Sequence, residues 1–117
     1  MPELPEVETM CRGISPIIGK TIRTVSVPPC RYRSIAINPP IYEINQRLAG
    51  TRIQAIVRLG KRVVIQTLDE SLILQPKMTG MVTLDDPPDP DHVRLQIECT
   101  GRTRVMFWDR RGLGTVE

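Results

Sequence analysis

The sequence predicts a mainly β domain, either a sandwich or a barrel, that begins with one α-helix. Two observations indicate this class: a succession of short segments in which apolar residues recur at every second position, and one apolar stripe of helical period near the N-terminus. The length of 117 residues suits a single domain with a single core and leaves no room for two domains.

Two segments carry helix signals. The first begins at Pro5, a residue suited to an opening turn, and should end near residues 15–16. Its apolar side chains recur at i, i+3, i+4 and i+7, namely at Val7, Met10, Cys11 and Ile14. The second helix is expected over residues 41–48, stopped by Gly50, with Glu43 and Arg47 paired four residues apart.

Most of the remaining chain has strand patterns separated by Gly, Pro or Asp. Residues 93–98 and 104–108 alternate with a period of two around Gly101, which predicts a hairpin. The other expected strands are residues 21–27, 52–58, 62–67, 71–75 and 81–84. Residues 85–91, rich in Asp and Pro, should form an exposed connection, and residues 110–117 read as a Gly-rich loop of a longer protein.

Composition excludes several classes of protein. With 40% hydrophobic and 25% charged residues, the chain is neither disordered nor membrane-spanning, and its N-terminus lacks the features of a signal peptide. Its three cysteines, Cys11, Cys30 and Cys99, never form a CxxC pair. We therefore expect them to be small core or surface residues, without a disulfide framework or a four-ligand zinc site.

Basic residues are mostly arginine, thirteen against three lysines, and are unevenly distributed. Between residues 12 and 66 there are ten basic residues and one acid, Glu43, whereas acids gather at the N-terminus and in residues 85–91. Because the guanidinium fork matches phosphate geometry, this distribution suggests an anionic polymer as partner. A basic solvated surface gives the same pattern, so both interpretations stay open.

The extreme N-terminus carries candidate chemistry. Removal of Met1, which a small second residue permits, would leave Pro2 with a secondary amine. An α-amino group has a pKa of about 7.7–8.0, so part of it is unprotonated at neutral pH and can attack an aldehyde-like carbon to form an iminium ion. Glu3 and Glu6 are close enough in sequence to move protons. Pro and Glu also suit any helix start, so spacing alone leaves both interpretations open.

Residues 1–9 (MPELPEVET) closely resemble the opening of the formamidopyrimidine-DNA glycosylases, bacterial enzymes of base-excision repair. Four further motifs match in order and spacing: residues 60–62 (GKR), 77–80 (KMTG), 91–93 (DHV) and 109–114 (DRRGLG). Leu4 stands where endonuclease VIII relatives carry Gly, which is closer to the oxidised-purine branch. The resemblance covers essentially the whole chain and implies a two-sheet antiparallel β-sandwich with an N-terminal α-helix.

The resemblance implies a bifunctional DNA glycosylase and AP lyase that removes 8-oxoguanine and formamidopyrimidines from duplex DNA. Pro2 would attack C1′ of the damaged nucleotide, and the resulting Schiff base would lead to strand cleavage by elimination. Glu3 is the expected acid that opens the sugar and expels the base. Glu6 would hold water or the deoxyribose, and Lys61 would transfer a proton in β-elimination.

A nucleotide that leaves the helix must be replaced in the stack. Met78, Arg111 and Leu113 match the family's void-filling positions, with Arg111 facing the orphaned base, and His92 matches a phosphate-contacting position. Without the resemblance, the core would be favoured for Met78, and for His92 an ordinary surface residue and a functional one would both stay open. Three positions depart from the family pattern: Leu113 replaces Phe, Gly112 a basic residue and Lys77 a Gly. None of these changes removes a reacting group.

The resemblance also implies a larger protein. Residues 1–117 would be its N-terminal catalytic domain, and a C-terminal half would supply a helix–two-turn–helix and a zinc finger. We expect no cofactor in this fragment, Zn²⁺ in the other half, and little turnover by the fragment alone. The protein would be a cytoplasmic bacterial monomer without a membrane partner, acting on double-stranded DNA with an oxidised purine or abasic site. Two alternatives remain: a non-catalytic DNA-binding module, and an ordinary β-sandwich interaction domain.

Overall fold

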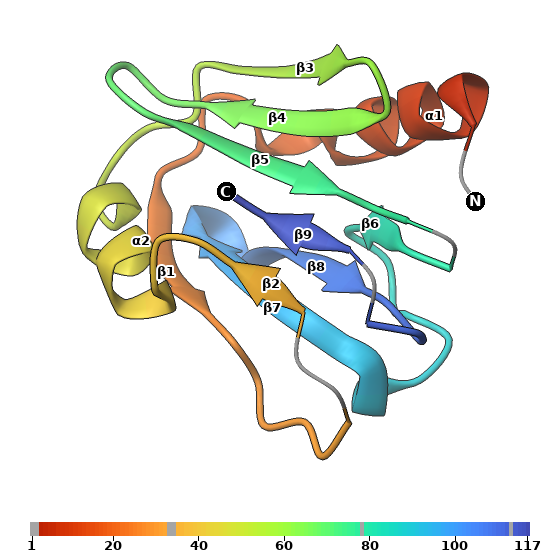
Figure 1. Ribbon diagram of the computed structural model, residues 1–117. Coiled ribbons are helices and arrows are strands. Elements are labelled where there is room, and N and C mark those ends of the chain that lie inside the picture. Colours follow the sequence, from red (N-terminus) through yellow and green to blue (C-terminus); the bar gives the residue numbers. More distant parts are fainter. Residues whose placement is uncertain (1–2, 33–34, 78, 113) are drawn as a thin grey trace.

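Two β-sheets packed against each other form the body of the molecule (Figure 1). The computed structural model describes residues 3–32, 35–77, 79–112 and 114–117. One sheet has four strands in the order β1-β7-β8-β6, and the other has five in the order β2-β9-β5-β4-β3. The predicted mainly β sandwich with an N-terminal helix is therefore confirmed.

The four-stranded sheet is built around the predicted hairpin. Its strands are β1 (Ile22–Ser26), β6 (Met81–Thr83), β7 (Val93–Cys99) and β8 (Thr103–Trp108). The turn between β7 and β8 contains Gly101, whose φ of 77° lies in the left-handed region that favours glycine. Leu95 lies opposite Phe107 and Ile97 opposite Val105, and all four side chains are buried in the core.

Arg94 departs from the alternation predicted for residues 93–98. The register with β8 shifts between Val93 and Leu95, and Arg94 is only 3% exposed although strict alternation places it on the polar face. Its Nε donates a hydrogen bond of 2.8 Å to the carbonyl oxygen of Asp109, in the turn that follows β8. A polar partner inside the fold thus overrides the period-two pattern.

The five-stranded sheet contains both strands that sequence patterns did not predict. Its strands are β2 (Ala36–Ile37), β3 (Ala55–Leu59), β4 (Arg62–Gln66), β5 (Ser71–Gln75) and β9 (Thr115–Val116). β2 and β9 have two residues each and pair in parallel, whereas the other strands pair antiparallel in the part of the chain that the structure describes. β3 starts later than the predicted segment 52–58, because Arg52 bridges to Thr21 and the Ile53 N–H bonds to the carbonyl of Lys20.

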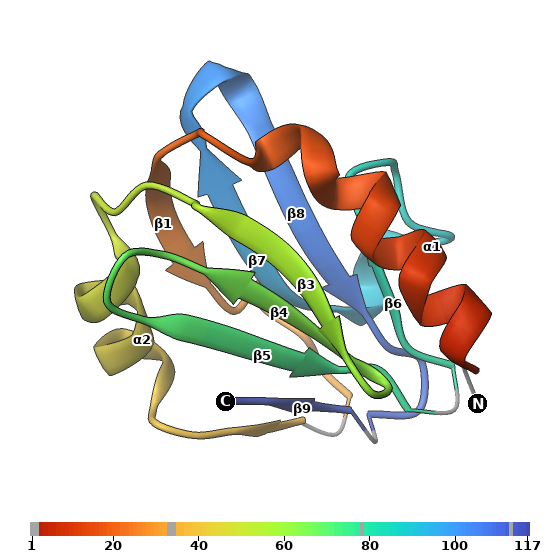
Figure 2. The ribbon, with the colours of Figure 1, turned by 90° about the horizontal axis from the view of Figure 1, so that it is seen from above.

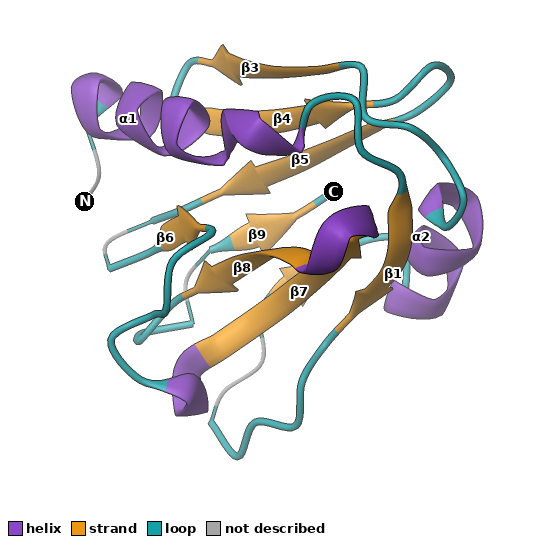
Figure 3. Cartoon of the chain, turned by 180° about the vertical axis from the view of Figure 1, so that it is seen from behind, coloured by secondary structure: helices purple, strands orange, loops and turns teal. Residues whose placement is uncertain are grey.

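The two longer helices lie at opposite ends of the sandwich (Figures 2 and 3). α1 (Leu4–Ile14) buries Val7, Cys11 and Ile14, as the predicted stripe requires, and packs against β6, β3 and β4. α2 (Ile41–Leu48) has the predicted bounds and packs against β1. α1 therefore covers the end of the sandwich where the edge strands β3 and β6 leave it open.

Glu70 and, more weakly, the predicted partner Glu43 raise the pKa of the Arg47 guanidinium, but the hydrogen-bonded ion pair forms with Glu70. Arg47 donates from Nε to Glu70 Oε1 at 3.0 Å and from its terminal nitrogen to Oε2 at 2.6 Å. Glu70 lies directly before β5, and its carboxylate accepts both nitrogens in the bidentate geometry that suits a guanidinium fork. A tertiary partner of better geometry displaces the local helical one.

The cysteines behave as the sequence predicts. Cys11 and Cys99 are buried, Cys30 is partly buried, and all three are free thiols. Burial raises the pKa of the Cys11 and Cys99 thiols above the ordinary value, which keeps them protonated and unreactive. Within the part of the chain that the structure describes, no helix is long and apolar enough to cross a membrane.

Candidate active site and nucleic-acid interface

Two of the predicted catalytic side chains meet at the N-terminal end of α1. Glu3 is the N-cap residue, and its carbonyl oxygen accepts the Val7 N–H at 3.0 Å. Lys61, from the turn between β3 and β4, places Nζ 3.3 Å from Glu3 Oε2. The two side chains are 40% and 62% exposed for Lys61 and Glu3, so the pair lies on an open surface. Pro2 adjoins Glu3 in sequence and lies outside the described residues.

A second ion pair fixes the β3–β4 turn against α1. Arg58 Nε donates to Glu8 Oε2 at 3.0 Å, and another nitrogen of the same guanidinium donates to the Gly60 carbonyl at 3.0 Å. Since Gly60 precedes Lys61, these bonds lie next to the point where Lys61 leaves the turn. Glu6 is exposed in the first turn of α1, where the helix dipole favours a negative charge.

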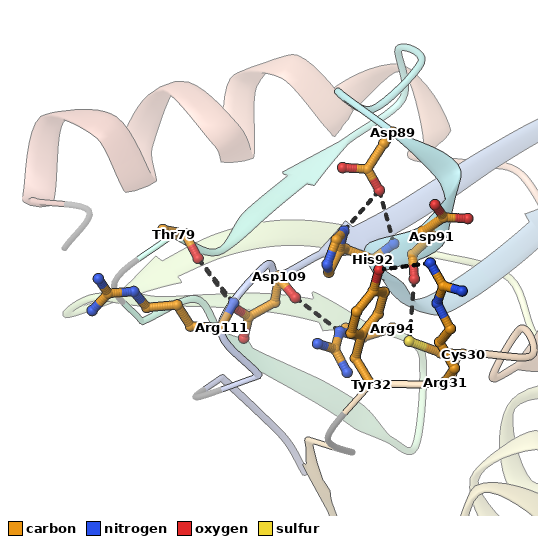
Figure 4. Close-up of polar contacts among 10 residues, drawn as sticks. All are labelled: Cys30, Arg31, Tyr32, Thr79, Asp89, Asp91, His92, Arg94, Asp109 and Arg111. Atoms are coloured by element: carbon orange, nitrogen blue, oxygen red, sulfur yellow. Dashed lines mark hydrogen bonds and ion pairs between the residues drawn. The ribbon is translucent and has the colours of Figure 1, made fainter.

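The predicted void-filling side is organised around Asp109. This residue follows β8 and is fully buried. Its Oδ1 accepts hydrogen bonds from the N–H groups of Arg111 at 3.2 Å and Gly112 at 3.1 Å, and Oδ2 accepts the Gly114 N–H at 2.7 Å. The side chain of Arg111 is exposed and extends away from this turn (Figure 4).

The other two predicted void-filling residues, Met78 and Leu113, lie outside the described residues. Their described neighbours are nevertheless in contact with one another. Thr79 Oγ1 lies 3.4 Å from Asp109 Oδ1 and 3.3 Å from the backbone nitrogen of Arg111. The segment after β5 and the turn after β8 therefore meet through one carboxylate.

His92 is held by contacts on several sides. Its Nδ1 lies 2.8 Å from Asp89 Oδ1, which also accepts the His92 backbone N–H at 3.0 Å. The hydrogen bond from the ring holds the pKa of the Asp89 carboxyl below its ordinary value. Tyr32 stacks on the imidazole with centroids 4.3 Å apart, and Trp108 meets its edge at 6.0 Å. His92 is consequently a fixed side chain, only 15% exposed.

Sequence reasoning missed the residues that hold these groups in place. Asp109 stands in a motif that the sequence analysis singled out, yet it received no role there. An Asp followed by glycines three and five positions later is a signal for a side chain that hydrogen-bonds its own turn. Tyr32 has no comparable signal, because its partner His92 is distant in sequence.

No metal centre is built from the described residues, where no group of three or more His, Cys, Asp and Glu side chains is placed to hold an ion. Cys11 and Cys99 are buried in the main hydrophobic core among aliphatic side chains. The thiols of this chain thus do not fit a zinc site of the kind that four cysteines form.

Residues 1–116 match the family model of the formamidopyrimidine-DNA glycosylase N-terminal domain. The chain belongs to the formamidopyrimidine-DNA glycosylase family. The relative from Mycobacterium leprae is 39% identical over 97% of this chain and 41% of its own length, and that from Bacillus subtilis is 34% identical over 99% and 42%. The chain thus spans about two fifths of the length of these formamidopyrimidine-DNA glycosylases.

Solved structures of formamidopyrimidine-DNA glycosylases share the fold. The Lactococcus lactis enzyme in complex with DNA containing Fapy-dG has a TM-score of 0.80 and 30% identity, covering 98% of this chain and 43% of that one. MutM in complex with DNA containing carbocyclic 8-oxo-G has a TM-score of 0.81 and 30% identity, covering 99% and 43%. The family and fold expected from residues 1–9 and the later motifs are confirmed.

Proposed function

We propose that residues 1–117 form the N-terminal catalytic domain of a DNA glycosylase with AP lyase activity that removes 8-oxoguanine and formamidopyrimidines from duplex DNA. The observation that carries the proposal is the contact of Lys61 Nζ with Glu3 Oε2 at 3.3 Å. It brings the Lys61 ammonium to the carboxylate of Glu3, the residue that follows Pro2, and both groups can exchange protons with a substrate. The DNA complexes of structural relatives support the choice of substrate.

The first step is nucleophilic substitution at C1′. Once Met1 is removed, the lone pair of the Pro2 amine attacks C1′ and the bond from C1′ to the base breaks. The amine proton leaves with the base. Glu3 gives a proton to O4′ while the base leaves and so assists its expulsion; the C1′–O4′ bond breaks, and a positively charged iminium ion joins Pro2 to the opened sugar. Glu6, exposed in the same first turn, holds water or the deoxyribose.

The second step is elimination. The iminium ion withdraws electrons from C2′, so a C2′ proton can be removed and the C3′–O bond breaks, releasing the 3′ phosphate and cutting the strand. The Glu3 carboxylate, left after the protonation of O4′, can accept the C2′ proton, and the Lys61 ammonium beside it can supply a proton to the leaving phosphate oxygen. Hydrolysis of the remaining iminium ion by water releases the sugar fragment as an unsaturated aldehyde and returns the free Pro2 amine.

The other predicted residues bind DNA around the extruded nucleotide. The exposed guanidinium of Arg111 has two parallel donors with which to read the orphaned base, and Met78 and Leu113 fill the void. His92, fixed by Asp89, contacts a phosphate. Zinc belongs to the part of the protein beyond these residues and takes no part in the steps above.

A second candidate is a non-catalytic DNA-binding module on the same scaffold. It is favoured by the ten basic residues against one acid between residues 12 and 66, because phosphate contacts alone give salt-dependent affinity. Such a module binds damaged and undamaged duplex alike, and blocking the Pro2 amine leaves its binding unchanged.

Borohydride trapping separates the two candidates. The full-length protein, with Met1 removal verified by intact mass, is mixed with a duplex containing 8-oxoguanine and reduced. A covalent adduct that maps to Pro2 is the expected result, since borohydride converts the iminium ion to a stable amine. Measurable DNA binding by protein with a free Pro2, but without an adduct, would favour the binding module.

A further inference from the structure

We infer that Asp109 is a positioning residue that fixes three DNA-contacting segments relative to one another, and so determines how strictly the base opposite the lesion is read. The inference rests on the proposed function, which assigns DNA contacts to these segments. They are the segments that contain Thr79, His92 and Arg111, and Asp109 has a hydrogen bond to each of them.

Both the side chain and the backbone of Asp109 take part. The backbone N–H donates to the His92 carbonyl at 3.0 Å, and the backbone carbonyl accepts Nε of the buried Arg94 at 2.8 Å. These two bonds place Asp109 beside β7. Its carboxylate is then directed toward Thr79 and the backbone of the following turn (Figure 4).

Thr79 closes the link between two segments that are distant in sequence. Its hydroxyl donates to Asp109 Oδ1 at 3.4 Å and accepts the Arg111 N–H at 3.3 Å. The Arg111 N–H is therefore shared between the hydroxyl and the carboxylate, which lies 3.2 Å away. Any movement of the Arg111 backbone must break contacts with both partners.

The turn that carries Arg111 has little room for another conformation. Gly112 has a φ of 71°, which a side chain disfavours. A Cβ on Gly114 would lie 2.7 Å from Phe107 Cζ and 2.9 Å from Asp109 Oδ2, too close for any other residue. Because the carboxylate is fully buried, it is stable there only while the turn supplies its N–H donors.

The consequence should be selective. The exposed side chain of Arg111 has many rotamers, so the protein can preorganise its guanidinium chiefly by fixing its backbone. The bonds of Asp109 reach Thr79, His92, Arg94 and its own turn, whereas Glu3 and Lys61 are held by α1 and the β3–β4 turn. Loosening Asp109 must impair base reading more than the chemistry at Pro2.

The test compares variants of the full-length protein. Asp109→Asn replaces one carboxylate oxygen by an amide nitrogen, which donates a hydrogen bond and cannot accept one. One of the N–H groups bound to the carboxylate then loses its acceptor. The extreme case is the Gly114 N–H, which Oδ2 now accepts at 2.7 Å. Thr79→Val removes the linking hydroxyl at nearly constant volume, and Thr79→Ser restores it. Asp86→Asn loses the same charge at an exposed position and serves as control.

Two quantities are measured for each variant: single-turnover excision of 8-oxoguanine opposite cytosine divided by that opposite adenine, and borohydride trapping on an abasic-site duplex. We expect the ratio to fall about tenfold in Asp109→Asn and about threefold in Thr79→Val, with a smaller loss of trapping. Thr79→Ser and Asp86→Asn should keep the wild-type ratio.

An unchanged ratio in Asp109→Asn and Thr79→Val, or trapping lost in the same proportion as the ratio, would overturn the inference. If Asp109→Asn does not fold, the ratio measured for Thr79→Val against that for Thr79→Ser tests the inference by itself. If the wild-type protein forms the borohydride adduct and the variants keep its excision ratio, only the role of Asp109 is refuted. A wild-type protein that neither traps nor distinguishes the opposite base refutes the proposed function itself.

Discussion

The two ends of the candidate site are held in contrasting ways. At the N-terminus of α1, Glu3 and Lys61 share one ion pair between side chains that are 62% and 40% exposed. At the turn after β8, the fully buried carboxylate of Asp109 accepts three backbone N–H groups and lies 3.4 Å from the Thr79 hydroxyl. An exposed ion pair contributes about 0–1 kcal/mol, whereas each buried donor left without an acceptor costs about 1–3 kcal/mol.

The proposed function accounts for this difference. A nucleophile that attacks C1′ has to admit a nucleotide extruded from a duplex, so its neighbours must be accessible before DNA arrives. A residue that reads a base by paired hydrogen bonds needs a defined position, because a bidentate contact tolerates little displacement. We therefore infer that the turn after β8, which carries Arg111, is preorganised before DNA binds. The N-terminal end of α1, with Glu3 and Lys61, reaches its final arrangement only when substrate is bound.

The largest effect is expected at Pro2. Pro2→Gly keeps an α-amine but makes it primary and flexible, so strand cleavage and borohydride trapping should each fall by about 100-fold or more. Circular dichroism should show an unchanged fold, because the residue precedes α1. Protein that retains Met1 is the matched control, since its Pro2 nitrogen is an amide and should give no adduct. Trapping at the wild-type rate in either protein would remove Pro2 from the mechanism.

Glu3→Gln should come next. Without a carboxylic acid to protonate O4′, excision of 8-oxoguanine should fall by about 100-fold. Cleavage at a preformed abasic site should fall less, because that sugar already equilibrates with its open aldehyde. Single-turnover rates on the two substrates measure the difference. An equal loss on both would show that Glu3 does not act in sugar opening.

A smaller effect is expected for Arg111, in the turn after β8. Arg111→Ala should weaken discrimination of the opposite base by about 1–3 kcal/mol, the value of a bidentate contact, while abasic-site trapping continues. Arg110→Ala is the control, since it removes the same charge from an exposed neighbour in the same turn. The ratio of excision rates opposite cytosine and adenine is the measurement. A ratio that Arg110→Ala lowers as much as Arg111→Ala would indicate a general electrostatic effect.

Local patterns in the sequence predicted the elements well wherever packing agrees with periodicity. The stripe of α1 and the hairpin of β7 and β8 follow from the spacing of apolar residues, and the end of α2 follows from the stop signal at Gly50. β2 and β9 were not predicted, because two residues cannot show a period. Arg94 was misplaced, because its burial depends on the Asp109 carbonyl, which alternation within β7 cannot reveal.

Within the candidate site, too, local motifs were predicted and contacts between distant segments were not. The residues assigned to chemistry came from short motifs, and of these the structure brings Glu3 and Lys61 together. The residues that hold the predicted DNA-contacting groups in place are linked by contacts between distant segments, such as Tyr32 with His92 and Thr79 with Asp109. Such contacts arise only when the sheets assemble, so one sequence contains no local signal for them.

The smallest expected effect tests the opening comparison directly. Lys61→Met keeps the length of the side chain and removes its charge, so the Val7 amide, bonded to the Glu3 carbonyl, should change its hydrogen-exchange protection by about twofold or less. Asp109→Asn should lower protection of at least one of the Arg111, Gly112 and Gly114 amides by about tenfold or more, because one of the two carboxylate oxygens that accept them becomes an amide nitrogen. Measured in full-length protein, a large loss at Val7 with all three of these amides unchanged would reverse the assignment of the loosely and tightly held ends. That result would mean that the ion pair, exposed as it is, preorganises the reacting groups before DNA binds.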